Sequence, residues 1–305
     1  MSSTTPPAGS ALSTTAFATL LLIALMMGGN HVAARLAFDN GVDVITAVAF
    51  RSGITALVVA FIVWQQRVSL ALQAKHRWSL PAIGLLIAAQ SYCLYSAVAR
   101  LPVALALLAF NLYPLFTALW ARVLYGHRAE RRVLIAMPVI LAGLALALDV
   151  LGAASGLGAG AHWGRIGAGV AFAVAAAAIF GLALVLTQHE AGTLDGRLRT
   201  ATTMGLVGLV AGAAALAQGG FHLPTAPAGW GGLVMLTFLY GTAFTIMFTV
   251  LPRLGVVGNS AIMNVEPIFA LVLAWAVLGQ RIAPMQVAGG LVVVACVVWL
   301  GLRRR

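Results

Sequence analysis

Long hydrophobic runs separated by short polar segments make up almost the whole sequence. Each run is about 20 residues long, the length that an α-helix needs to cross the hydrocarbon core of a bilayer. They lack the strict alternation of a strand, and backbone polar groups in lipid have to be satisfied within their own segment. We therefore predict an all-α membrane protein of ten transmembrane helices, at 15–37, 44–64, 80–99, 102–125, 132–151, 165–187, 199–218, 229–250, 257–278 and 284–302.

The second half of the chain repeats the first at an offset of 153 residues. This offset predicts two five-helix repeats, over 15–151 and 165–302. Because five is odd, the second copy has to enter the membrane from the opposite side, and such inverted repeats are typical of secondary transporters that work by alternating access. The coinciding pairs are Gly28 with Gly181, Arg100 with Arg253, Asn111 with Asn264, Pro114 with Pro267, Phe116 with Phe269 and Gly126 with Gly279.

Composition supports a membrane protein and argues against a soluble one, since 62% of the residues are hydrophobic and only 8% are charged. The formal charge of +11 does not indicate nucleic-acid binding, because the basic residues stand at the ends of the runs and form no stripe. Thirteen of the 18 lysines and arginines fall on the side of the two termini. The positive-inside rule then predicts a multi-pass protein of the bacterial inner membrane with both termini in the cytoplasm.

Both ends of the chain are predicted to lie outside the helices. Residues 1–14 are rich in Ser, Thr and Pro and have no basic residue, which indicates a disordered cytoplasmic tail and not a signal peptide. The three arginines at 303–305 are expected to meet anionic headgroups. Cys93 and Cys296 both lie within apolar runs, where packing is the expected role.

Motifs for catalysis, metal binding or nucleotide binding are missing from the sequence. It contains no HExxH, GxxxxGK[ST], CxxC or GxSxG pattern. We therefore predict a protein that is not an enzyme, with no cofactor and no metal, whose partners are a small-molecule substrate and the lipid bilayer. A monomer is compatible with this prediction.

The repeated blocks carry a resemblance to a known family. Gly28-Gly29-Asn30-His31, Phe50-Arg51 and two Pro-to-Gly blocks, from Asn111 to Arg128 and from Asn264 to Arg281, resemble the EamA-type ten-helix proteins of the drug/metabolite transporter superfamily. Within it the chain is most similar to exporters of aromatic and other neutral amino acids. The family pattern usually has an acid after the block's glycine, whereas His127 and Gln280 stand there in this chain.

Glu266 is the most informative polar residue, because it is the one acid that we place well inside a predicted span. It precedes Pro267, which cannot donate to the helical carbonyl four residues earlier. Glu266 could bind a substrate amino group or carry a proton, or it could bond a neighbouring helix in its protonated form. Asn264 shares its span, and the matching span of the first half offers Asn111.

Two further spans present an aromatic face with a few polar groups. The first contains Gln90, Ser91 and Tyr95, and its repeat mate contains Phe244, Thr245 and Phe248. Aromatic walls with polar anchors suit an amphipathic solute, and helix packing is the alternative interpretation.

Four more polar residues lie in the first two spans. Asn30 and His31 follow a pair of glycines, and His31 could relay a proton, bind substrate or form a structural bond. Arg51 and Arg35 could attract a carboxylate. We favour the alternative that both reach the headgroups or pair with acids such as Asp39.

Pro114 and Pro267 occupy matching positions in the two halves and are the candidate hinges. A static kink is the alternative. Taken together, the residues predict an exporter of small amphipathic metabolites, with aromatic and other neutral amino acids as substrates. Efflux of cationic drugs or other metabolites, and a solute channel, are the alternatives. Transport could be driven by proton antiport through Glu266 or His31, or by the solute gradient alone.

Overall fold

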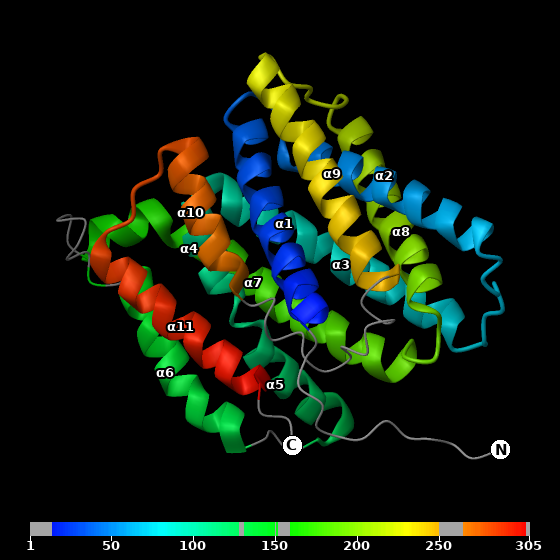
Figure 1. Ribbon diagram of the computed structural model, residues 1–305, viewed down its shortest axis with the longest axis horizontal. Helices are drawn as coiled ribbons and strands as arrows, with labels where there is room; N and C mark the ends of the chain where they lie inside the picture. The colour runs from blue at the N-terminus through cyan, green and yellow to red at the C-terminus, as the bar shows by residue number, and fades with distance from the viewer. Residues whose placement is uncertain (1–13, 128–130, 150, 152–158, 250–264, 303–305) are drawn as a thin grey trace.

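The computed structural model describes residues 14–127, 131–149, 151, 159–249 and 265–302, all of whose regular structure is helical (Figure 1). The predicted tail and the three terminal arginines lie outside the described residues, and so does Asn264. The helices are α1 Thr14–Phe38, α2 Val44–Gln65, α3 His76–Arg100, α4 Val103–Phe110, α5 Tyr113–Tyr125, α6 Arg131–Ala147, α7 Ala159–Glu190, α8 Gly196–Ala217, α9 Pro227–Thr249, α10 Glu266–Leu278 and α11 Pro284–Leu302.

Helix lengths agree with the ten predicted spans. Within the described residues, seven segments are long and apolar enough to cross a membrane, and α4 and α5 together form one of them. Three shorter apolar helices, parts of α6, α10 and α11, account for the rest. The all-α membrane fold is confirmed, although α7 begins several residues before the predicted 165 and ends three after the predicted 187.

The fourth span is a pair of helices and not the continuous helix that we predicted over 102–125. Helix α4 ends at Phe110, and α5 begins at Tyr113 with Pro114 in its first turn. Proline favours a helix start, where its missing N–H costs nothing. Pro114 therefore does not kink a helix but begins one, and Pro267 lies in the first turn of α10 in the same way.

Helices α5 and α10 also end alike. Each ends at a glycine with a positive φ, 69° at Gly126 and 63° at Gly279, which is the left-handed C-cap that glycine adopts without strain. Both helices are 13 residues long, and both boundaries of α10 lie 153 residues after those of α5. The sequence repeat is therefore a structural repeat.

Packing between helices follows the same repeat. Helix α1 packs against α9 and α10, and its counterpart α7 packs against α3 and α5, the counterparts of α9 and α10 (Figure 1). A Cβ added to Gly28 would lie 3.0 Å from the backbone nitrogen of Ala270, and one added to Gly181 would lie 2.8 Å from that of Thr117. Matching glycines thus let matching helices approach closely.

Two pairs of matching helices pack directly against each other. In the α6–α11 pair, the Cys296 thiol lies 3.9 Å from the Ala136 carbonyl oxygen. A Cβ added to Gly143 would lie 3.0 Å from the Gly289 carbonyl oxygen. From the first contact to the second the residue number rises along α6 and falls along α11, so the two helices are antiparallel. The α2–α8 pair is the other, and Gly53 and Gly208 lie at its close approach.

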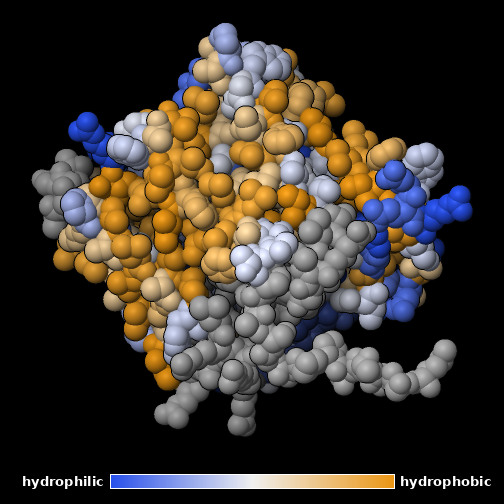
Figure 2. Space-filling model, viewed as in Figure 1, coloured by the Kyte–Doolittle hydropathy of each residue, from blue (hydrophilic) through white to orange (hydrophobic). Residues whose placement is uncertain are grey.

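The surface of the helical bundle is apolar, as a bilayer requires. Large hydrophobic side chains are exposed over its length, among them Leu57, Leu209, Phe238 and Trp275. Figure 2 shows apolar side chains across the middle of the visible face, with hydrophilic residues gathered at its edges. Such an apolar area is far larger than soluble monomers expose, so it identifies the lipid-facing surface.

Candidate functional site

A chain of buried polar side chains links α1, α2 and α3 in the interior of the bundle. The Arg51 guanidinium donates to the Ser91 hydroxyl at 2.9 Å and to the Tyr95 hydroxyl at 3.1 Å. The Tyr95 hydroxyl in turn donates to the Asn30 side-chain oxygen at 2.9 Å. We call these four residues, Asn30, Arg51, Ser91 and Tyr95, the polar cluster; each is at most 5% exposed.

Aromatic rings lie on two sides of the Arg51 guanidinium. Its central carbon is 4.6 Å from the centroid of the Tyr95 ring and 3.9 Å from that of Tyr240 on α9. The Tyr240 ring packs at 4.4 Å against Phe244, one turn further along the same helix. The polar cluster is thus bounded by aromatic groups from both halves of the chain.

An ion-pairing contact between α1 and α10 lies beside the polar cluster. His31 Nε2 is 3.3 Å from Glu266 Oε1, and the His31 ring packs edge-on against the Tyr95 ring at 5.6 Å. The Glu266 side chain remains 23% exposed, whereas His31 is buried. Glu266 is the first residue of α10, so the contact ties the start of that helix to α1.

Several donors in this region have no hydrogen-bond partner within the described part of the chain. They include Arg51 Nε and Asn30 Nδ2. The ring nitrogen His31 Nδ1, a donor or an acceptor according to the tautomer, also lacks a partner there. No described carboxylate lies within ion-pair distance of Arg51, which is 4% exposed. Burying a charge costs several kcal/mol, and a cation–π contact returns only about 0.5–2 kcal/mol. The cluster therefore carries a positive charge that its own residues only partly compensate.

Comparison with known families agrees with this architecture. The model of the EamA-like transporter family matches residues 14–148 and again residues 167–302. Both halves of the chain therefore match, and the two matches begin 153 residues apart. The chain belongs to the EamA-like transporter family. It is thus a membrane protein of a family of small-solute transporters and not of enzymes, as the resemblance in the sequence implied.

Solved structures show the same fold for this EamA-like transporter. One chain, described as "Crystal structure of protein", matches with a TM-score of 0.60 and 19% identity over 95% of this chain and 97% of its own. At that identity the match concerns the fold alone. No match was found among curated protein sequences.

Five of the predicted site residues come together in the EamA-like transporter. Asn30, Ser91 and Tyr95 belong to the polar cluster, and His31 and Glu266 form the contact beside it. They derive from α1, α3 and α10. Phe244 adjoins them through Tyr240.

The remaining predicted residues lie elsewhere or outside the described part. Gln90 precedes Ser91 on α3 and so points about 100° away from it around the helix axis. Thr245 donates to the Gly241 carbonyl oxygen of its own helix. Asn111 lies at the break between α4 and α5, next to an aromatic group of Phe110, Tyr113 and Phe180. The Phe248 side chain and all of Asn264 are outside the described residues.

Arg51 is the residue that sequence reasoning placed wrongly. We favoured a headgroup or acid contact for it, but it is buried and bonded to Ser91 and Tyr95. It stands seven residues after the start of α2, or about 10 Å along the axis, and that depth was a usable signal. For Arg35 the interpretation is confirmed, since its Nε lies 2.9 Å from Asp39.

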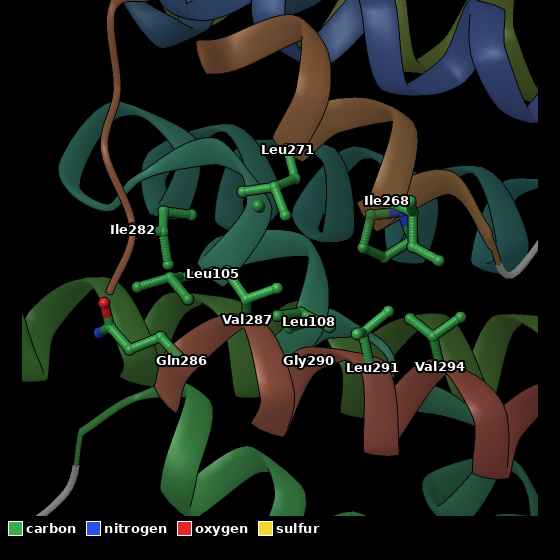
Figure 3. A pocket seen from close by; sticks show the side chains of 12 residues that line it. Leu105, Leu108, Ile268, Leu271, Ile282, Gln286, Val287, Gly290, Leu291 and Val294 are labelled. Atoms are coloured by element: carbon green, nitrogen blue, oxygen red, sulfur yellow. The ribbon is translucent and has the colours of Figure 1, made fainter. Parts of the chain in front are cut away.

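An apolar recess lies between α4, α10 and α11 (Figure 3). Aliphatic side chains such as Leu105, Ile268, Leu271 and Leu291 line it, and Gln286 lies at one end. Pro267, directly after Glu266, is also part of its wall. The recess suits hydrocarbon, whereas the groups that bind polar atoms are in the polar cluster.

Proposed function

We propose that this EamA-like transporter exports small amphipathic metabolites across the bacterial inner membrane, with aromatic and other neutral amino acids as its substrate class. The observation that carries the proposal is the polar cluster beside the rings of Tyr240 and Phe244. Aromatic surfaces match an apolar side chain, and the unpaired donors match the polar end of an amino acid. Both termini are then cytoplasmic, as the charge distribution predicts.

The proposed mechanism is alternating access between the two five-helix repeats, inverted relative to each other across the bilayer. Its support is the antiparallel packing of α6 against α11 and the matching contacts of α1 and α7. Two halves that contact each other through matching helices can exchange conformations, which opens a central site to one side and then to the other. The helix starts at Pro114 and Pro267 are the proposed hinges, since each proline lies in the first turn of a 13-residue helix.

Purified protein in liposomes provides the test. We expect labelled phenylalanine and leucine to exchange against the same unlabelled amino acid, with counterflow stimulated from the opposite side. Liposomes that contain no protein are the control. If no amino acid moves while the protein remains folded, the substrate class is wrong. Single-channel currents in place of counterflow would establish a solute channel.

Glu266→Gln separates amino-acid export from efflux of cationic drugs. The glutamine amide oxygen still accepts a hydrogen bond from His31, so we expect the fold to survive. Amino-acid counterflow should fall by about tenfold, since the glutamine cannot make the charge-assisted hydrogen bond that Glu266 would make to the substrate's amino group. Uptake of cationic compounds by the wild type that Glu266→Gln abolishes while the fold survives would favour the cationic alternative.

A further inference from the structure

We propose that the polar cluster is a carboxylate-binding site in which the substrate's carboxylate serves as the counter-ion of Arg51. The inference rests on the proposed function and narrows it, because it requires the transported molecule to carry a carboxylate and makes Arg51 the residue that recognises it. The sequence alone favoured a headgroup or acid contact for Arg51 and kept attraction of a carboxylate as the alternative.

All described carboxylates are engaged elsewhere. Glu266 contacts His31, Asp39 contacts Arg35, Asp43 caps α2 and contacts His222, Glu190 accepts from Tyr125, and Asp195 contacts Arg197. Asp149 likewise has a partner of its own. Arg51, buried in the interior, is therefore without an acidic partner among the residues that the structure describes.

The two side chains bonded to the Tyr95 hydroxyl each retain an unsatisfied donor. Tyr95 accepts from Arg51 and donates to Asn30, so its oxygen joins the two side chains. Arg51 Nε and Asn30 Nδ2 are both buried and both lack a partner within the described chain. A carboxylate is an acceptor with two oxygens and several lone pairs, and it can satisfy a guanidinium and an amide donor together.

The neighbouring rings explain why the substrate also has an apolar part. Tyr240 lies against the guanidinium and Phe244 against Tyr240, so an apolar group next to the bound carboxylate would meet an aromatic surface. Water is a poor substitute for such a ligand, because it brings no charge. The Arg51 guanidinium and the two rings together favour an organic acid or amino acid over an inorganic anion.

Three probes that differ in one group test the proposal on the wild-type protein. L-Phenylalanine, 3-phenylpropionate and 2-phenylethylamine share the ring, and only the first two have a carboxylate. We expect the first two to raise the melting temperature of the detergent-purified protein by at least about 2 °C at saturation, and the amine to leave it unchanged. A shift by the amine equal to that by phenylalanine, or no shift by any probe, overturns the carboxylate site.

A built-in carboxylate provides an independent test. Ser91 Oγ is 2.9 Å from Arg51, so Ser91→Asp would place a permanent counter-ion there, and Ser91→Asn is the matched control without charge. We expect Ser91→Asp to melt higher than Ser91→Asn and to lose the shift by 3-phenylpropionate. If the two variants have the same melting temperature, or if 3-phenylpropionate still raises that of Ser91→Asp, Arg51 does not bind a carboxylate.

The two proposals fail in different ways. Shifts by the carboxylate probes without any amino-acid counterflow in liposomes would overturn the proposed export and leave the carboxylate site standing. Phenylalanine counterflow that 2-phenylethylamine inhibits as strongly as unlabelled phenylalanine does would overturn the carboxylate site and leave the export standing.

Discussion

The two halves of the molecule share a backbone arrangement but not a chemistry. Gly28 brings α1 onto α10, and Gly181 brings α7 onto α5, with close approaches to backbone atoms at matching positions. Yet the contact that His31 and Glu266 make in the first pair has no counterpart in the second, where Leu184 and Tyr113 stand at the equivalent positions.

The residues of the polar cluster also differ from their equivalents in the second half. The equivalent of Arg51 is Met204, and Tyr240 contacts both, through its ring to Arg51 and through its hydroxyl to the Met204 sulfur at 3.5 Å. Asn30 corresponds to Ala183, and Ser91 to Phe244. The repeat thus supplies symmetric packing, while all four residues of the polar cluster come from the first half.

The largest expected effect on transport comes from substituting Arg51, with its equivalent Met204 as the comparison. Arg51→Gln removes the charge that we assign to substrate binding, and counterflow in liposomes should fall by at least about 30-fold, the loss typical for one partner of a buried charge pair. The matched change Met204→Leu conserves volume and should alter counterflow by less than about threefold. Equal effects of the two variants would contradict the functional asymmetry.

Packing, in contrast, should respond equally in both halves. Gly28→Val and Gly181→Val each push a side chain against backbone atoms of the facing helix, and each should cost about 1–3 kcal/mol of stability. The control is Gly164→Ala, because no atom lies within 4 Å of an added Cβ there. Melting temperatures of the three purified variants are the measurement, and a large loss in only one valine variant would argue against symmetric packing.

The two tyrosines of α3 permit a sharper test of the polar cluster. Tyr95→Phe deletes the hydroxyl that joins Arg51 to Asn30, and we expect the affinity for phenylalanine to fall by about tenfold or more, since bonds to charged groups contribute about 1.5–3 kcal/mol. Tyr92→Phe, on the same helix but 43% exposed, should leave that affinity unchanged. Isothermal titration would measure both, and an unchanged affinity in Tyr95→Phe would remove Tyr95 from the site.

The smallest effect is expected at the start of α8. Asp195 accepts from Arg197, and this contact holds the pKa of the Asp195 carboxyl below its usual range. A lowered folded-state pKa stabilises the fold above the unfolded pKa, and the contribution disappears as the pH falls through the folded pKa. Asp195→Asn should therefore melt slightly lower than wild type near pH 7, and the difference should vanish in strong acid. A difference that persists there would have another cause.

Local features of the fold were predictable because their causes are local. Run lengths predicted the spans, and the predicted spans ended next to Gly126 and Gly279. The helix starts at Pro114 and Pro267 were not predicted, since both prolines were placed inside continuous spans. The 153-residue offset predicted the repeat, because two copies of one five-helix unit use the same residues for the same helix ends and contacts.

Tertiary structure alone decided which polar groups meet. Ser91 follows Arg51 by 40 residues, and Glu266 lies 235 residues beyond His31, so no helical period relates either pair. The sequence by itself determined that polar residues stand inside several spans, but it did not place Arg51, for which a headgroup or acid contact was favoured. Only the packing of α2 against its neighbours, chiefly α8 and α9, determined that Arg51 points inward, because helix rotation is set by the neighbours against which each face is buried.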